Sequence, residues 1–308
     1  MKNVFQKTLD KTFSFKGIGL HSGKITNVKL LPSSENKGII FKRIDLSSNN
    51  EVKANYNSVS SATLCTTLKN KFGAKASTVE HLLAALYING INNAIIEIDN
   101  EEIPIMDGSS REFLKLIERA GVKRLSKKRK FLKILKSFRF ENRGREILIE
   151  PSDDFEVDFQ LDFPNQLIGQ QKNSVNFFKD NLTDVMNSRT FCLYEDIEKI
   201  KKDGLAKGGS LDNALVIKNE KVLNVGGLRN KKEFVNHKIL DLAGDIALSE
   251  FSFLGKIICY RGGHELTNIF LKELLNNYKE FFEIVEIEDE KISKISHKTQ
   301  STRLVVNA

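Results

Sequence analysis

The segment FVNHKILDLAGD, at residues 234–245, carries the most informative pattern of the sequence. Apolar residues separate His237, Asp241 and Asp245, which predicts a helix over residues 234–249 with a polar stripe. Residues four apart lie on one helix face, so His237 and Asp241 are neighbours. An imidazole and a carboxylate at this spacing can share a metal ion such as zinc. The alternative is an ordinary polar pair on a solvated helix face.

Asp245 continues the polar stripe eight residues after His237. It lies about 12 Å further along the helix axis, which is too far to join the same ion easily. It is well placed to orient a second histidine. His264 is a candidate because it follows two glycines at a predicted strand-to-helix turn. A neighbouring carboxylate would keep His264 protonated, as an acid or oxyanion stabiliser; a helix cap or surface residue is the alternative.

Glu80 and His81 open another predicted helix. Ser77 and Glu80 also fit a capping box, a purely structural alternative. Adjacent helix residues point about 100° apart, so Glu80 and His81 would not easily bind one metal ion together. Separate roles are favoured, in which His81 binds the metal and Glu80 takes a proton from water. The zinc-peptidase patterns HExxH and HxxEH do not match, because the order is Glu-His, position 84 is Ala and position 77 is Ser.

The two halves of the chain show the same order of predicted elements. These elements are strands 28–31 and 38–41, helix 81–86, strand 94–98 and helix 111–120, then strands 146–149 and 155–163, helix 234–249, strand 256–260 and helix 265–277. An additional strand–helix–strand block occupies about 190–225. We place a domain boundary near residue 125, within a basic run at 123–130, which gives domains at 1–125 and 126–285 and a C-terminal tail at 286–308.

Composition narrows the functional classes. The chain has 308 residues, with 48 basic and 40 acidic residues and a net charge of +8, which favours anionic partners such as nucleic acid, phosphates or lipid headgroups. Three cysteines without a CxxC pattern argue against a disulfide scaffold or a cysteine-built zinc site. No signal peptide or spanning apolar segment is recognisable, so we expect a soluble cytoplasmic protein.

Seven motifs in a consistent order resemble the UDP-3-O-acyl-N-acetylglucosamine deacetylase family. They are GIGLHSGK (17–24), STVEHLLAAL (77–86), IPIMDGS (103–109), SRTF (188–191), GLAKGGSLDNALV (204–216), FVNHKILDLAGD (234–245) and GGHELTN (262–268). The resemblance extends from about residue 4 to about residue 280. It implies an α+β fold of two similar domains, each a sandwich of helices packed on sheets, with a βαβ insertion in the second.

The resemblance also implies the roles of individual residues. The zinc ligands would be His81, His237 and Asp241, and the general base would be Glu80. The remaining catalytic residues would be His264, its orienting partner Asp245, and Thr190, which contacts the carbonyl of the scissile amide.

Further residues match positions that contact substrate in the family. Phe191 matches an aromatic contact, Lys238 a lysine on the sugar–diphosphate side, and Arg145 more loosely a basic residue near the nucleotide. Cys65 matches a cysteine close to the metal, and Cys192 replaces a usually smaller residue. The fatty-acyl passage would be lined by Leu20, Ile197, Ala206, Gly209, Ser210 and Ala214.

The implied activity is zinc-dependent hydrolysis of an acetamide on an acylated UDP-sugar, a step of lipid A biosynthesis; Fe²⁺ suits the same ligands. We expect a monomer without a transmembrane segment, in peripheral contact with the inner membrane, and without a nucleic-acid partner. Two alternatives remain open. One is another zinc amidohydrolase, and the other is a basic nucleic-acid-binding protein, motivated by the charge and the run at 123–130.

Overall fold

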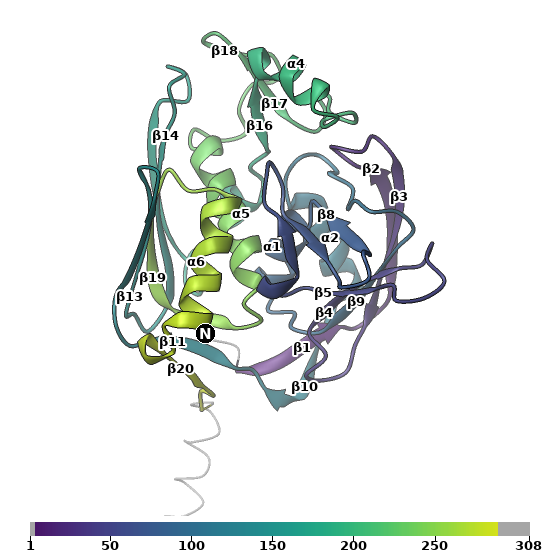
Figure 1. The fold of residues 1–308 in the computed structure, drawn as a ribbon, viewed down its shortest axis with the longest axis vertical. Coiled ribbons are helices and arrows are strands. Elements are labelled where there is room, and N and C mark those ends of the chain that lie inside the picture. The colour runs from purple at the N-terminus through teal and green to yellow at the C-terminus, as the bar shows by residue number, and fades with distance from the viewer. Residues whose placement is uncertain (1–3, 289–308) are drawn as a thin grey trace, which may run out of the picture.

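A computed structural model describes residues 4–288, in which two β-sheets enclose a layer of helices (Figure 1). The first sheet, on the right of Figure 1, has five strands. In spatial order these are β2 (Phe13–Ile18), β3 (Ile25–Pro32), β9 (Ala94–Ile98), β4 (Ile39–Arg43) and β5 (Glu51–Lys53).

The second sheet, on the left of Figure 1, has seven strands. They are β11 (Phe131–Ile134), β12 (Phe138–Asn142), β13 (Arg145–Glu150), β14 (Phe155–Asp162), β15 (Gln170–Asn176), β19 (Ser252–Tyr260) and β20 (Phe282–Val285). Strand β19 organises this sheet, because it pairs with β13, β14 and β11. Alternate residues of β14 are buried, which matches the period of a strand with one face against a core.

The helices between the sheets form the core. They are α1 (Glu80–Ile88), α2 (Arg111–Ala120), α5 (Glu233–Ala247) and α6 (His264–Asn277). Helix α5 is buried along nearly its whole length, so its polar stripe lies inside the protein and not in solvent. The predicted α+β class is confirmed. No helix within residues 4–288 has the length and apolarity needed to span a bilayer.

The repeated order of elements has a counterpart in the strand pairing. In the first half α1 lies between β4 and β9 in sequence, and these strands pair in parallel. In the second half α5 lies between β14 and β19, which also pair in parallel. Each unit then ends with a helix, α2 or α6. The division into two domains at residue 125 stays a prediction; that residue lies within β10 (Val122–Lys128).

The block predicted at about 190–225 forms a βαβ unit at the top of Figure 1. It consists of β16 (Phe191–Leu193), α4 (Tyr194–Lys202), β17 (Leu215–Lys218) and β18 (Lys221–Val222). Strands β16 and β17 are parallel, as a βαβ unit requires. Together with β18 they make a separate three-stranded sheet, whose strands pair with neither large sheet.

The remaining elements are short or peripheral. They are β1 (Phe5–Leu9), β6 (Val59–Ser61), β7 (Thr67–Lys69), β8 (Lys75–Ser77), α3 (Thr183–Met186) and two 3₁₀ turns, Tyr56–Ser58 and Lys279–Phe281. The basic run lies mainly in β10, which pairs antiparallel with β1. Most of the tail predicted at 286–308 lies outside the described residues.

Helices α1 and α5 touch through their backbones where they cross. A Cβ atom added at Gly244 on α5 would lie 2.1 Å from the carbonyl oxygen of Glu80, the first residue of α1. A side chain at this position would therefore push the two helices apart. The absence of a side chain at Gly244 lets the polar stripe of α5 approach the start of α1.

We predict that Gly244→Ala destabilises the protein. Alanine is intrinsically better than glycine in a helix by about 0.5–1 kcal/mol, but overpacking against the backbone of Glu80 costs about 1–3 kcal/mol. The free energy of unfolding, measured by denaturant titration, should fall. Gly263→Ala is the matched control, because its added Cβ would meet no atom within 4 Å. A Gly244→Ala variant more stable than the wild type would contradict the close crossing.

Candidate metal and catalytic site

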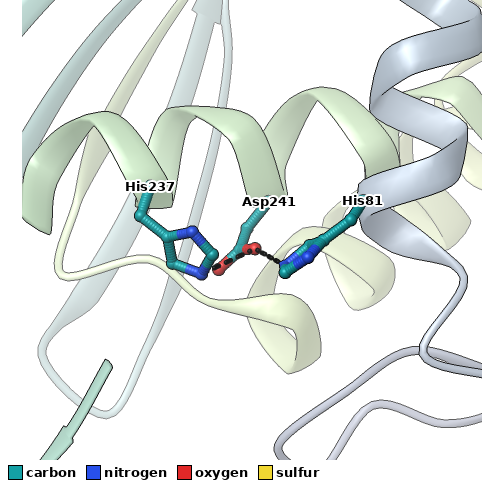
Figure 2. A group of neighbouring side chains, drawn as sticks. All are labelled: His81, His237 and Asp241. Carbon is teal, nitrogen blue, oxygen red and sulfur yellow. Dashed lines mark ion pairs between the residues drawn. The ribbon is translucent and has the colours of Figure 1, made fainter. Parts of the chain in front are cut away.

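The α1–α5 crossing brings His81, His237 and Asp241 together (Figure 2). One ligand atom from each lies within 4.8 Å of the other two, and all three residues are buried. Nε2 of His81 lies 3.4 Å from Oδ1 of Asp241, and Nε2 of His237 lies 3.3 Å from the same oxygen. This oxygen is buried and has no hydrogen-bond partner among the described residues. The arrangement fits a divalent cation, since two nitrogens and a carboxylate oxygen converge.

The protonation states of these groups also suit metal binding. Burial lowers the pKa of His237 to about 3, so its imidazole is neutral near pH 7. Nδ1 of His237 lies 3.2 Å from the carbonyl oxygen of Ser188, which fixes Nδ1 as the donor and leaves the Nε2 lone pair facing Asp241. Burial raises the pKa of Asp241, but His237, Lys238 and His264 outweigh it and hold that pKa well below its usual range.

Glu80 and His264 lie beside the three candidate ligands. Nε2 of His264 is 3.6 Å from Oε1 of Glu80 and 3.8 Å from Oδ2 of Asp241. Its Nδ1 donates to Oδ2 of Asp245 at 2.8 Å, the pairing that the spacing along α5 predicted. Burial opposes protonation of His264, but Asp245, Glu80 and Asp241 raise its pKa to about 10. Burial is also the main cause that raises the pKa of Glu80.

The capping box expected at Ser77 and Glu80 is wrong. Val79 is the N-cap of α1, and Glu80 is the first helical residue instead of the third. The hydroxyl of Ser77 donates to the carbonyl of Glu101 instead. The carboxylate of Glu80 turns toward the candidate metal ligands and accepts a hydrogen bond from the backbone of Thr66. The structural alternative for Glu80 is thereby removed.

Thr66 is a residue that sequence reasoning missed. Its N–H donates to Oε2 of Glu80 at 3.1 Å, and its hydroxyl donates to Oδ1 of Asp245 at 2.6 Å. One fully buried threonine thus touches both carboxylates that flank His264. The sequence feature that could have pointed to Thr66 is its neighbour Cys65, which matches a cysteine close to the metal in the family. Burial and the charge of Glu80 raise the pKa of Cys65 to about 12, so its thiol stays protonated.

Glu102 was missed as well, and it fixes the loop at residues 19–23. Its carboxylate accepts hydrogen bonds from the backbone of His21 at 2.8 Å, from the backbone of Ser22 at 2.7 Å and from the hydroxyl of Thr78 at 2.9 Å. This loop places His21 at the candidate site. In the sequence Glu102 is the second of two consecutive glutamates, and nothing in this local pattern indicates its contacts with distant residues.

Two adjoining cavities meet at the site. The first, of about 500 Å³, is lined by Glu80, His81, His237, Asp241 and His264, together with Thr190, Phe191, Lys238 and Arg145. Asp245 does not line it, because it lies behind His264. The second, of about 910 Å³, shares Leu20, Thr190 and Phe191 with the first. It is also lined by Cys192 and by the other predicted passage residues, Ile197, Ala206, Gly209, Ser210 and Ala214.

The two basic residues predicted near the substrate both have carboxylate partners. Nζ of Lys238 lies 3.0 Å from Oδ2 of Asp241 and 5.4 Å from the ring centre of Phe191. A guanidinium nitrogen of Arg145 lies 2.7 Å from Glu265. Both side chains border the cavity that holds the candidate ligands, where the carboxylates of Asp241 and Glu265 offset their charges.

The backbone of Thr190 is fixed by two hydrogen bonds. Its N–H donates to the carbonyl of Gly108 at 2.8 Å, and its own carbonyl accepts from Leu215 of β17 at 2.8 Å. The Gly108 turn also approaches the backbone of Asn213 so closely that an added Cβ would lie 2.2 Å from its carbonyl oxygen. The first half of the chain thus anchors the βαβ insertion beside the candidate metal ligands.

Comparison with known proteins confirms the resemblance drawn from the seven motifs. The family model described as UDP-3-O-acyl N-acetylglycosamine deacetylase matches residues 6–276. A relative from Idiomarina loihiensis is 42% identical over 275 residues, covering 88% of this chain and 90% of its own. Relatives from Shewanella frigidimarina (40% identical, 93% and 94% covered) and Colwellia psychrerythraea (39%, 96% and 97%) are similar. All three bear the name UDP-3-O-acyl-N-acetylglucosamine deacetylase. With the family model matching most of its length, this chain belongs to the UDP-3-O-acyl-N-acetylglucosamine deacetylase family.

Proposed function

We propose that this chain hydrolyses the acetamide of UDP-3-O-(3-hydroxyacyl)-N-acetylglucosamine. The products are acetate and UDP-3-O-(3-hydroxyacyl)-glucosamine, and the reaction is the committed step of lipid A biosynthesis. The observation that carries the proposal is the meeting of His81, His237 and Asp241 with Glu80 and His264 at one cavity, in a chain of this family.

Zinc is the metal we propose for His81, His237 and Asp241, although the same ligands also suit Fe²⁺. When bound, zinc would polarise the acetamide carbonyl and lower the pKa of water at the site. Three protein ligands are typical of a catalytic site with an open position, whereas structural zinc sites have four.

Glu80 is the general base in this proposal, and it accepts a proton from the attacking water. Burial raises its pKa toward the range of a useful base, and the backbone of Thr66 fixes one of its oxygens. The other oxygen faces His264 at 3.6 Å, on the side of the cavity. Adjacent residues of α1 therefore serve two purposes, with His81 as ligand and Glu80 as base.

His264 is the general acid. Asp245 holds it protonated and fixes its ring, so Nε2 is a cationic donor that faces the cavity. Together with the hydroxyl of Thr190 it stabilises the oxyanion that forms when water attacks the carbonyl. It then donates its proton to the departing amine.

The two cavities divide the substrate between them. Lys238 contacts the sugar–diphosphate side of the substrate and Arg145 lies near the nucleotide, both at the smaller cavity, and Phe191 contacts the substrate where the two cavities meet. The acyl chain lies in the larger cavity, against the passage residues of the βαβ insertion. Since the cavities share Leu20, Thr190 and Phe191, one molecule can occupy both.

Substitutions at Glu80 and His237 should have different effects on metal content and on turnover. Glu80→Gln should retain the metal and lose turnover by about 10²–10⁴, the usual contribution of a general base. His237→Ala should lose the metal and, as a result, the activity. Metal analysis of the purified variants and an acetate-release assay measure the two quantities. Glu118→Gln, at an exposed position of α2, is the control. Wild-type turnover in Glu80→Gln would contradict its role as base.

Thr66 should act as a positioning residue. Thr66→Val removes the hydroxyl bound to Asp245 and keeps the N–H bound to Glu80. Losing a hydrogen bond to a charged group costs about 1.5–3 kcal/mol, so kcat should fall about tenfold or more with little change in KM. Thr66→Ser, which keeps a hydroxyl, should restore most of kcat. Equal loss in both variants would contradict the hydroxyl's role.

The larger cavity should set acyl-chain preference. Ala214 lines it and is almost fully buried, so Ala214→Leu narrows the passage. Overpacking costs about 1–3 kcal/mol, so kcat/KM for a long-chain substrate should fall about tenfold relative to a short-chain one. The comparison uses acyl chains of graded length on the same UDP-sugar. An equal effect on all chain lengths would place the acyl chain elsewhere.

A further inference from the structure

A third cavity, of about 250 Å³, lies between α1 and α5 at the ends remote from the candidate metal ligands. Leu83, Leu86 and Tyr87 of α1 and Ala247 of α5 line it, whereas His81 stands at the opposite end of α1. Arg129 and Lys130, which follow β10, also line this cavity. The cavity is therefore separate from the two that meet at the active site.

Arg129 is the unusual residue of this cavity. It belongs to the basic run at 123–130, and so basic a run is typical of a solvated linker or an exposed strand edge, yet only 6% of Arg129 is exposed. One guanidinium NH₂ donates to the hydroxyl of Ser252, whereas its buried Nε has no hydrogen-bond partner among residues 4–288. Within the same range, no carboxylate forms an ion pair with it. A buried guanidinium carries five donors and a full charge, and it is costly to bury unless an acceptor pairs with it.

The polar groups around Arg129 cannot supply that acceptor. Oδ1 of Asn93 accepts from the backbone of Lys37 and Gly38, and Oε1 of Gln6 accepts from Asn36 and Asn93. Glu250 also lines the cavity, but it pairs with Lys53 at 2.7 Å and accepts from the Asn55 amide. The acceptors of the wall are thus engaged with other donors.

The remaining polar lining favours an anion. The hydroxyl of Tyr87 accepts from the backbone of Phe253 at 3.2 Å, and its own proton remains to be donated. Burial raises the pKa of Tyr87 to about 12, so this donor is retained at neutral pH. The pKa of the Lys7 ammonium is lowered, first by burial and second by the nearby positive charge of Arg129. Two cations thus act on the same region.

The rest of the lining is apolar. Leu83, Leu86, Ile91, Ala247 and Phe251 cover the other part of the wall. An inorganic phosphate would leave this surface without a partner, whereas a short aliphatic chain would bury against it. The volume is smaller than the range of about 300–1,000 Å³ typical of sites for drug-sized ligands, so the ligand must be small.

We propose that this cavity is a binding site for a small aliphatic monocarboxylate. Its carboxylate pairs with the free donors of Arg129 and the hydroxyl of Tyr87, in the planar geometry that a guanidinium offers to a carboxylate. Its alkyl part contacts the leucines of α1 and Ala247 of α5. The ligand thereby bridges the two helices that carry the candidate metal ligands. The proposal does not rest on the deacetylase reaction.

Isothermal titration calorimetry and thermal unfolding test the site in the full-length protein, with acetate, butyrate, hexanoate and inorganic phosphate as probes. Butyrate or hexanoate should bind more tightly than acetate and raise the unfolding temperature, while phosphate should not. Arg129→Met, which keeps an unbranched stem, should weaken butyrate binding about tenfold or more. Arg139→Met is the matched control, because Arg139 lies on the exposed side of β12.

Two further variants distinguish binding in this cavity from binding at the metal and from a folding defect of Arg129→Met. His237→Ala should bind butyrate as the wild type does, which distinguishes the cavity from carboxylate binding at the metal. Ala247→Leu leaves Arg129 in place and fills the apolar part, so hexanoate binding should weaken even if Arg129→Met fails to fold. Butyrate binding that survives both Arg129→Met and Ala247→Leu, or is lost in His237→Ala, would overturn the proposal. Equal binding of phosphate and butyrate would overturn the choice of a carboxylate.

Discussion

The backbone contact between Gly244 and Glu80 is the constraint on which the site depends. It places the start of α1 against the middle of α5, so that His81 meets His237 and Asp241 although more than 150 residues separate them in the chain. Neither helix supplies the three candidate ligands alone, because His81 and Glu80 point in different directions on α1 and Asp245 of α5 is engaged by His264. The two sheets enclose this helix pair and exclude solvent from it. The fold thus creates a buried polar centre where the backbones of two helices touch without a side chain between them.

Burying so many ionisable groups is unfavourable unless their charges compensate one another. Here the carboxylates of Glu80, Asp241 and Asp245 surround a protonated His264, and Lys238 pairs with Asp241. His237 stays neutral because burial lowers its pKa to about 3, and its Nδ1–H donates a hydrogen bond to the carbonyl of Ser188. The same set of contacts that makes burial tolerable also gives each group the protonation state that its proposed role requires. Thr66 links two of these carboxylates, so one residue holds both Glu80 and Asp245 beside His264.

Much of this could be predicted from sequence, because it depends on local periodicity. The spacing of His237, Asp241 and Asp245 along one helix predicted both the shared face and the contact with His264. The βαβ order of the insertion followed from alternating strand and helix patterns. The predictions that were wrong concern residues whose environment depends on contacts between distant segments of the chain. Ser77 and Glu80 satisfy a local capping pattern, but tertiary hydrogen bonds from Thr66 and to Glu101 replace it. Arg129 is buried within a run that looks solvated, since its guanidinium turns away from the exposed strand β10 and donates to the hydroxyl of Ser252.

The independence of the insertion's small sheet has an evolutionary consequence. Its strands β16, β17 and β18 pair with neither large sheet, and its attachment to the rest of the protein passes through loops such as the Gly108 turn. Substitutions in this unit can therefore reshape the larger cavity while the α1–α5 crossing and its polar centre stay intact. Under the proposed function, a lineage could adjust the length of the fatty acid in its outer-membrane lipid by drift in one small module, without any intermediate that lacks hydrolytic activity.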